Sequence, residues 1–393
     1  MARMEMNITG ISATIMTDTP PLVSSEFDIT SSGLSTFGAN MSENLTATNS
    51  TDAVLPAVWS WIPFTWHWWE VIQLILAIAG IIGNSLVMLV LFRVKRKLCS
   101  TDTLIAGLAL ADFLTSVFII PHAQVKTLPD TIAAQLYCRI IHSSSLMWTS
   151  ICASIFTLTT ISIERLMAVR YPFQFQHFFT SRSTSLVIGG IWLISLVINT
   201  VSFYVHYIVD GECAFGFSTP SFQKFIGVFY FIAEYLVPVS VMILAHVFTI
   251  RTLRERAQVK PYSAENQSQR PNKHFLRARR RVIEMLFIVV VIFIICWTPD
   301  QFGFLAFTVG IIDFSHFNSP VYRSFVVLAF VNSCANPIIY AARNPNFRQA
   351  LKELFRNVPS IRLQSVFAAI DETSNVSTDT SASKLYSVDK VVV

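Results

Sequence analysis

Seven apolar segments, each about 20 residues long, alternate with shorter polar segments along the chain. A helix that rises ~1.5 Å per residue needs about 20 apolar residues to cross the ~30 Å hydrocarbon core of a bilayer. The third segment is the clearest, because no residue between Arg139 and Glu164 carries a formal charge. The pattern predicts membrane-spanning helices at approximately 71–92, 103–124, 138–172, 185–205, 225–250, 282–309 and 321–342.

A different pattern follows the seventh segment. Between residues 344 and 357, Phe347 and Leu351 fall on one face of a helix, and Arg348 and Lys352 fall on the other. A helix of this kind lies along the cytoplasmic membrane interface. The predicted fold class is an all-α membrane protein, with a seven-transmembrane-helix bundle and a C-terminal amphipathic interfacial helix. We divide the chain into a tail at 1–68, a bundle at 69–343, an amphipathic helix at 344–357 and a tail at 358–393.

The first tail is rich in Ser and Thr and contains four acceptor sequences for N-glycosylation. Because N-glycans mark a secreted or extracellular surface, we expect this tail to be extracellular and disordered. The second tail is also rich in Ser and Thr from about Asp371, and we expect it to be disordered in the cytoplasm. The four acceptor residues are Asn7, Asn40, Asn44 and Asn49.

The charge distribution agrees with this orientation. The segments after the first, third and fifth predicted helices carry nearly all the Lys and Arg found between helices, which assigns them to the cytoplasm. The chain is 53% hydrophobic and 13% charged, with a mean hydropathy of +0.53, and these values exclude an ordinary soluble domain. The net charge of +5 is concentrated in short segments, which favours membrane lipids or a cytoplasmic protein as partner rather than nucleic acid.

Signals of other membrane-protein classes are weak. The sequence has no GxSG, HExxH or GxGD run, and its six cysteines do not have the spacing of a zinc site, so we expect no enzyme. A secondary transporter is a remote alternative. Transporters of this kind usually contain an internal repeat and paired interrupted helices, and the sequence shows neither.

One carboxylate, Asp112, lies near the middle of the second predicted helix, where it must be paired, protonated or hydrated. Oxygen-bearing side chains in other predicted helices suit a hard cation or a water cluster, and a hydrogen-bonded packing network is the other interpretation. Both interpretations remain open. The candidate partners are Ser154, Asn332, Ser333 and Asn336.

Short motifs recur in a fixed order, one or more per predicted helix, from about Trp69 to Arg356. Together they resemble the motifs of the rhodopsin-like (class A) G-protein-coupled receptors. The resemblance implies a ligand-operated switch in the plasma membrane, with the N-terminus outside and the C-terminus in the cytoplasm. The motifs are Gly83-Asn84, Leu108-Ala109-Leu110-Ala111-Asp112, Glu164-Arg165-Leu166, Trp192, Pro238, Cys296-Trp297-Thr298-Pro299 and Asn336-Pro337-Ile338-Ile339-Tyr340.

The resemblance also implies how the switch works. Glu164 would hold Arg165 at rest, and activation would release Arg165 toward a heterotrimeric G protein. Leu166 replaces the Tyr that is usual in this motif. Pro238, Ile155 and Phe293 would repack beneath the ligand, with Trp297 above them. The remaining switch residues are Pro299, Asn336, Pro337 and Tyr340.

Further sites follow from the same resemblance. Phe173, after Pro172, would seat in the G protein, and the basic third cytoplasmic loop, which includes Arg254 and Arg281, would contact it or anchor to anionic lipid. Ser and Thr at 373–387 are candidate sites for receptor kinases and arrestin. An allosteric sodium ion, the one possible cofactor, would be held by Asp112, Ser154, Asn332, Ser333 and Asn336.

The resemblance pairs Cys138, at the outer end of the third helix, with Cys213 in the second extracellular loop. In this chain 27 positions separate Cys138 from Arg165, whereas the family usually has 25. Two extra residues turn a helix by about 200°, so we expect a bulge or an uncoiled turn in the outer third helix.

The class of ligand is narrowed by what the helices lack. No acidic residue that could anchor an amine lies between Cys138 and Glu164, and the seventh helix has no Lys for retinal. Glu234 and Asp300 lie on adjacent helices, where they suit the basic group of a peptide; a protonated Glu234 and a solvated Asp300 are the other interpretation. The pattern is most similar to the neuropeptide branch, with a small polar or lipid ligand as the alternative. The candidate ligand contacts are His122, Gln124, Met147, Trp148, Glu234, Asp300 and Gln301.

Overall fold

The computed structural model describes residues 4–5, 58–94, 99–258, 273–313, 315–316 and 319–356. The predicted glycosylation sites Asn7, Asn40, Asn44 and Asn49 lie outside these residues, as does the tail from residue 357 onward.

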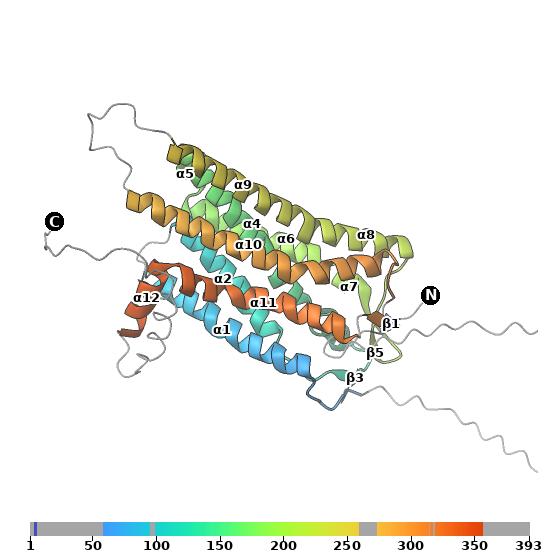
Figure 1. Cartoon of the computed structure of the whole chain (residues 1–393). Coiled ribbons are helices and arrows are strands. Elements are labelled where there is room, and N and C mark those ends of the chain that lie inside the picture. Colours follow the sequence, from blue (N-terminus) through green and yellow to red (C-terminus); the bar gives the residue numbers. More distant parts are fainter. Residues whose placement is uncertain are drawn as a thin grey trace, which may run out of the picture.

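In this described part, seven helical segments are long and apolar enough to cross a membrane, which confirms the predicted number. Figure 1 shows the helices packed side by side. Two of the spans are compound: the third combines α3 (Ile132–Leu136), η1 (Tyr137–His142) and α4, and the fifth combines α8 (Pro220–Tyr230), η2 (Phe231–Leu236) and α9. The long helices are α1 (Trp68–Val94), α2 (Ser100–Phe118), α4 (Ser145–Arg170), α6 (Ser181–Asn199), α9 (Val237–Gln258), α10 (Lys273–Thr308) and α11 (Pro320–Arg343).

Two shorter helices lie at one end of the bundle, α5 (Pro172–Phe178) and α12 (Pro345–Arg356), and the strands lie at the other end (Figure 1). Helix α12 contacts α1 and α11. It covers the stretch for which the sequence predicts an amphipathic helix, so the predicted all-α architecture is confirmed.

Helix α4 lies at the centre of the bundle, in contact with α2, α6 and α9. Its apolar side chains, including Ile155, Leu158 and Ile161, are buried, whereas α6 directs Leu186 and Leu193 outward, where they are 71% and 63% exposed. Exposed apolar side chains on a membrane-spanning helix meet lipid rather than water. The burial pattern therefore separates an inner helix from an outer, lipid-facing one.

The second helix is shorter than predicted. Helix α2 ends at Phe118, not near Gln124, because Pro121 has no backbone N–H and disfavours helical backbone in the residue before it. The chain then runs into β3 (Val125–Thr127), which pairs antiparallel with β2 (Ser60–Trp61). His122 and Gln124 thus lie in a connecting loop and not on the second helix.

The predicted irregularity in the outer third helix is confirmed at η1, which is a π-helical turn. The backbone N–H of Ser143 donates to the carbonyl of Cys138, five residues earlier, at 3.1 Å. Ser144 follows with φ of +52°, in the left-handed region, and α4 begins at Ser145. A π turn and a left-handed residue together take up extra residues without breaking the helix elsewhere.

A hairpin of β4 (His206–Val209) and β5 (Glu212–Phe215) covers this end of the bundle. Its two-residue turn, Asp210 and Gly211, has φ of +50° and +78°, as a tight hairpin turn requires. β1 (Met4–Glu5) adds to the free edge of β5. The disulfide between Cys138 and Cys213 is present, and it ties the hairpin to η1.

Candidate functional site

A cavity of about 220 Å³ lies beneath the hairpin, between the outer ends of the helices. Phe215 of β5 and His206 of β4 contribute to its wall. Gln124 is buried outside the cavity, where its backbone carbonyl accepts a hydrogen bond from the N–H of Ile62. The predicted ligand contacts that line the cavity are His122, Met147, Trp148, Glu234, Asp300 and Gln301.

Both predicted carboxylates are buried in the cavity wall. Tyr322 on α11 donates a 3.0 Å hydrogen bond from its hydroxyl to Asp300 on α10. Glu234 belongs to η2, the π turn that precedes Pro238, and accepts a hydrogen bond from the thiol of Cys152 on α4. Two acidic groups from adjacent helices therefore meet one cavity, and the donors described for them, Tyr322 and Cys152, are neutral.

The hairpin side of the cavity carries a titratable group, His206. Burial lowers the pKa of His206 to about 4; the carbonyl of Ser202, 3.1 Å from its Nδ1, opposes this shift, and the nearby His142 adds to it. The ring packs 5.2 Å from that of Phe215. At neutral pH this wall of the cavity is therefore uncharged and largely aromatic.

One helical turn below the cavity, Trp297 is buried on α10. Phe293, a further turn below, and Ile155 on α4 belong to the same apolar core. Pro238 is the second residue of α9, and Pro299 lies inside α10 between Trp297 and Asp300. Trp297 and Phe293 thus follow Asp300 along α10 into the apolar core that also contains Ile155.

At the centre of the bundle Asp112 is fully buried and satisfied by protein donors. The hydroxyl of Ser154 donates to one carboxylate oxygen and the amide of Asn336 donates to the other, each at 2.7 Å. Ser333 makes a third hydrogen bond to the carboxylate, and Asn332 is buried on the same helix, α11. One carboxylate with hydroxyl and amide oxygens is a donor set that fits a sodium ion. The same contacts also complete a packing network.

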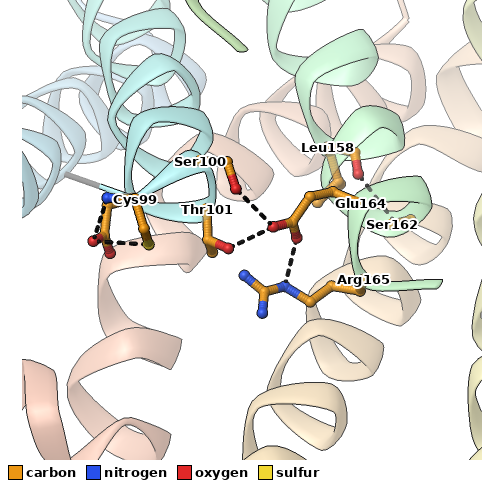
Figure 2. A network of polar contacts seen from close by, with 8 residues as sticks. Cys99, Ser100, Thr101, Leu158, Ser162, Glu164 and Arg165 are labelled. Carbon is orange, nitrogen blue, oxygen red and sulfur yellow. Dashed lines mark hydrogen bonds and ion pairs between the residues drawn. The ribbon is translucent and has the colours of Figure 1, made fainter. Parts of the chain in front are cut away.

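The opposite end of the bundle holds the Glu164–Arg165 pair. Figure 2 shows Glu164 between α2 and Arg165: its carboxylate lies 2.9 Å from Arg165 Nε and accepts hydrogen bonds from Thr101 (2.6 Å) and Ser100 (3.4 Å). Both hydroxyls belong to the first turn of α2, where the helix dipole also favours a negative charge. Glu164 is therefore held from two sides.

The other predicted switch and G-protein residues surround this pair. Tyr340 is buried on α11 beside Pro337 and packs 6.3 Å from Phe347 of α12. Pro172 starts α5, and Phe173 is 90% exposed on it. Arg254 is exposed on α9, whereas the side chain of Arg281 lies outside the described side chains.

Residues 83–340 match the sequence model of the family described as 7 transmembrane receptor (rhodopsin family). The chain belongs to this receptor family. The receptor is 31% identical to galanin receptor 2a of Danio rerio over 304 residues, which cover 74% of this chain and 80% of the relative. It is 30% identical to galanin receptor type 2 of Rattus norvegicus (70% and 73% covered) and 28% identical to the allatostatin-A receptor of Bombyx mori (71% and 77% covered).

Sequence analysis of the receptor missed a basic group in the cavity wall. Arg323 on α11 is only 7% exposed, lines the cavity, and lies 5.2 Å from the centre of the Trp69 ring. The sequence gives one usable signal: Arg323 is a charge inside a predicted membrane-spanning segment, and such charges commonly mark functional positions.

Proposed function

We propose that this receptor binds an extracellular peptide that inserts a basic group into the cavity, and that binding activates a heterotrimeric G protein. The observation that carries this proposal is that Glu234 and Asp300 line one buried cavity. A buried carboxylate is stabilised by a cationic partner that also donates hydrogen bonds, as the side chains of Arg and Lys do. Relatives named as galanin and allatostatin-A receptors support a peptide ligand.

The size of the cavity limits how the peptide binds. Its volume of about 220 Å³ is below the ~300–1,000 Å³ of pockets that enclose a drug-sized ligand. Such a space accepts one end of a peptide, or one or two side chains, while the rest of the peptide contacts the hairpin above it. The β5 strand and the loops around it would then supply most of the contact surface.

The α10 helix provides a direct route from the cavity to the switch. Asp300 and Gln301 line the cavity, and Trp297 and Phe293 follow at one-turn intervals toward the core. Pro299 lies between the cavity residues and Trp297, and it removes a backbone hydrogen bond from α10. A force that the ligand exerts on Asp300 would therefore bend α10 at this position. Motion of α10 relative to α4 would free Arg165 to contact the G protein.

The remaining assignments belong to the same proposal. The receptor would lie in the plasma membrane with its N-terminus extracellular, its basic segments against cytoplasmic lipid, and its C-terminal tail available to receptor kinases and arrestin. A bound sodium ion would be held by Asp112 with Ser154, Ser333 and neighbouring oxygens, and would supply positive charge to the resting network.

The test is G-protein activation in cells that express the receptor, in response to galanin, allatostatin-A and a library of Arg-containing peptides. Arg165→Ala should abolish the response. Asp300→Asn and Glu234→Gln should each weaken an active peptide about 10- to 100-fold, as expected for loss of a charged hydrogen bond, whereas Asp313→Asn, an exposed acidic residue outside the cavity, should not. Activation by a lipid or small polar molecule, with every peptide silent, would overturn the peptide assignment.

A further inference from the structure

The cavity wall carries charges of both signs. Glu234 on η2 and Asp300 on α10 form its acidic part, and Arg323 on α11 forms a basic part. Tyr322 and Arg323 are neighbours in the chain and lie about 100° apart around α11. Tyr322 reaches Asp300, whereas Arg323 packs over Trp69 of α1. The acidic and basic groups are thus directed to different sides of the same space.

The guanidinium of Arg323 is buried with incomplete compensation. Its Nε has no hydrogen-bond partner among the described residues. Trp69 provides a cation–π contact at 5.2 Å, and the buried carboxylate of Glu70 attracts the charge electrostatically. Glu70 also accepts a hydrogen bond from the backbone N–H of His67 at 3.0 Å, so its charge is shared with the start of α1.

We propose that Arg323 binds a carboxylate of the ligand, so that the peptide end that enters the cavity carries an acidic as well as a basic group. A guanidinium presents its N–H groups as a planar fork that matches a carboxylate, which makes Arg a selective group for this partner. This inference rests on the proposed peptide function and adds a second charged group to the ligand. The carboxylate is either the C-terminus of the peptide or an Asp or Glu side chain.

The experiment uses synthetic hexapeptides that contain one Arg, each prepared in three forms: with a free C-terminal carboxylate, with a C-terminal amide, and with the amide plus one Asp. Potency is measured as G-protein activation in cells expressing the full receptor. At least one acid-bearing form should be at least about 10-fold more potent than the plain amide. If the acid forms and the amide are equally potent, the inference is overturned.

The potency of the better acid-bearing form divided by that of the plain amide is the acid-to-amide ratio. Arg323→Gln should bring this ratio to about 1, and Lys126→Gln, which removes an exposed cation on β3, should leave it unchanged. Arg323→Lys keeps a positive charge but loses the planar fork of N–H groups, so its acid-to-amide ratio should lie between those of the wild type and Arg323→Gln. This variant keeps the test decisive if Arg323→Gln folds poorly. A purely structural role for Arg323 would weaken all three peptide forms equally and leave the ratio at its wild-type value, which would overturn the inference.

Failure of the inference is distinct from failure of the proposed function. If peptides activate the receptor and Asp300→Asn weakens them, but Arg323→Gln leaves the ratio unchanged, the peptide function stands and the carboxylate site is wrong. If neither these hexapeptides nor galanin, allatostatin-A or any library peptide activates the wild-type receptor, both proposals are overturned.

Discussion

The hydroxyl of Thr101 donates a 2.6 Å hydrogen bond to the carboxylate of Glu164, which also lies 2.9 Å from Arg165 Nε. The first turn of α2 therefore helps to hold the carboxylate that is proposed to restrain Arg165. A hydrogen bond to a charged group contributes about 1.5–3 kcal/mol, so loss of this contact should measurably loosen Glu164.

Thr101→Val should raise basal G-protein activation several-fold, because the methyl group cannot hold Glu164 in place. The measurement is nucleotide exchange without ligand, corrected for receptor abundance at the cell surface. Thr103→Val is the matched control, since the hydrogen bond described for the Thr103 hydroxyl goes to the backbone carbonyl of Cys99, the N-cap of α2, and not to Glu164. Equal basal activity in the wild type and Thr101→Val would show that Glu164 does not depend on α2.

Sodium should stabilise the purified receptor through Asp112. A ligand that binds the folded state alone contributes about 2.7 kcal/mol at a concentration of 100 times its Kd. Thermal unfolding in sodium chloride should therefore occur at a higher Tm than in choline chloride at the same ionic strength. This difference should vanish in Asp112→Asn. A sodium-dependent shift that persists in Asp112→Asn would place the ion elsewhere.

The end of the bundle that carries the hairpin should lose stability in acid because of His206. Its pKa is about 4 in the folded receptor and about 6.5 in an unfolded chain, so the unfolded state binds the proton more readily. The stabilisation is complete above pH 6.5 and is lost as pH falls from about 6.5 toward 4, with a slope of up to ~1.4 kcal/mol per pH unit.

Thermal unfolding between pH 7.5 and pH 4.5 measures this effect. His206→Gln should flatten the pH dependence of Tm, and His177→Gln, which removes an exposed histidine on α5, should leave it intact. If both variants keep the wild-type profile, the acid sensitivity arises from other groups.

Ser144 should tolerate only residues that accept left-handed backbone. Its φ of +52° costs about 1–2 kcal/mol for residues with a Cβ atom and more for β-branched side chains, whereas Asn and Gly adopt it readily. Ser144→Val should lower Tm by several degrees and weaken peptide binding, and Ser144→Asn should do neither. Ser185→Val, at an exposed helical position on α6, controls for the general effect of adding valine.

Most of the architecture follows from the sequence because the bilayer fixes the length and polarity of a helix that crosses it. The seven spans were predictable on these grounds. An irregularity in the outer third helix was predictable from the residue count between Cys138 and Arg165 set against the spacing usual in the family, but its form, a π turn, was not. The end of α2 was misplaced since apolar residues continue past Phe118, and hydropathy alone does not register the effect of Pro121 on the backbone.

The candidate site was predictable in part. Carboxylates such as Asp300 stand out in an apolar segment, and the cavity contains Glu234 and Asp300, the two that were assigned to the ligand. Arg323 was missed because its contact with Trp69 depends on how α11 is rotated against α1, and this rotation is set by packing between residues far apart in the sequence. Gln124 was misassigned because it follows the end of the helix on which it was expected.

The disulfide between Cys138 and Cys213 has a kinetic consequence. It fixes β5 to η1, while Phe215 of the same strand forms part of the cavity wall. Under the proposed mode of binding, a peptide end held under this strand would leave when the hairpin or the helix ends shift, so the opening rate of the hairpin would limit dissociation. The duration of each signal would then depend on the stiffness of the hairpin as well as on the strength of the contacts below it.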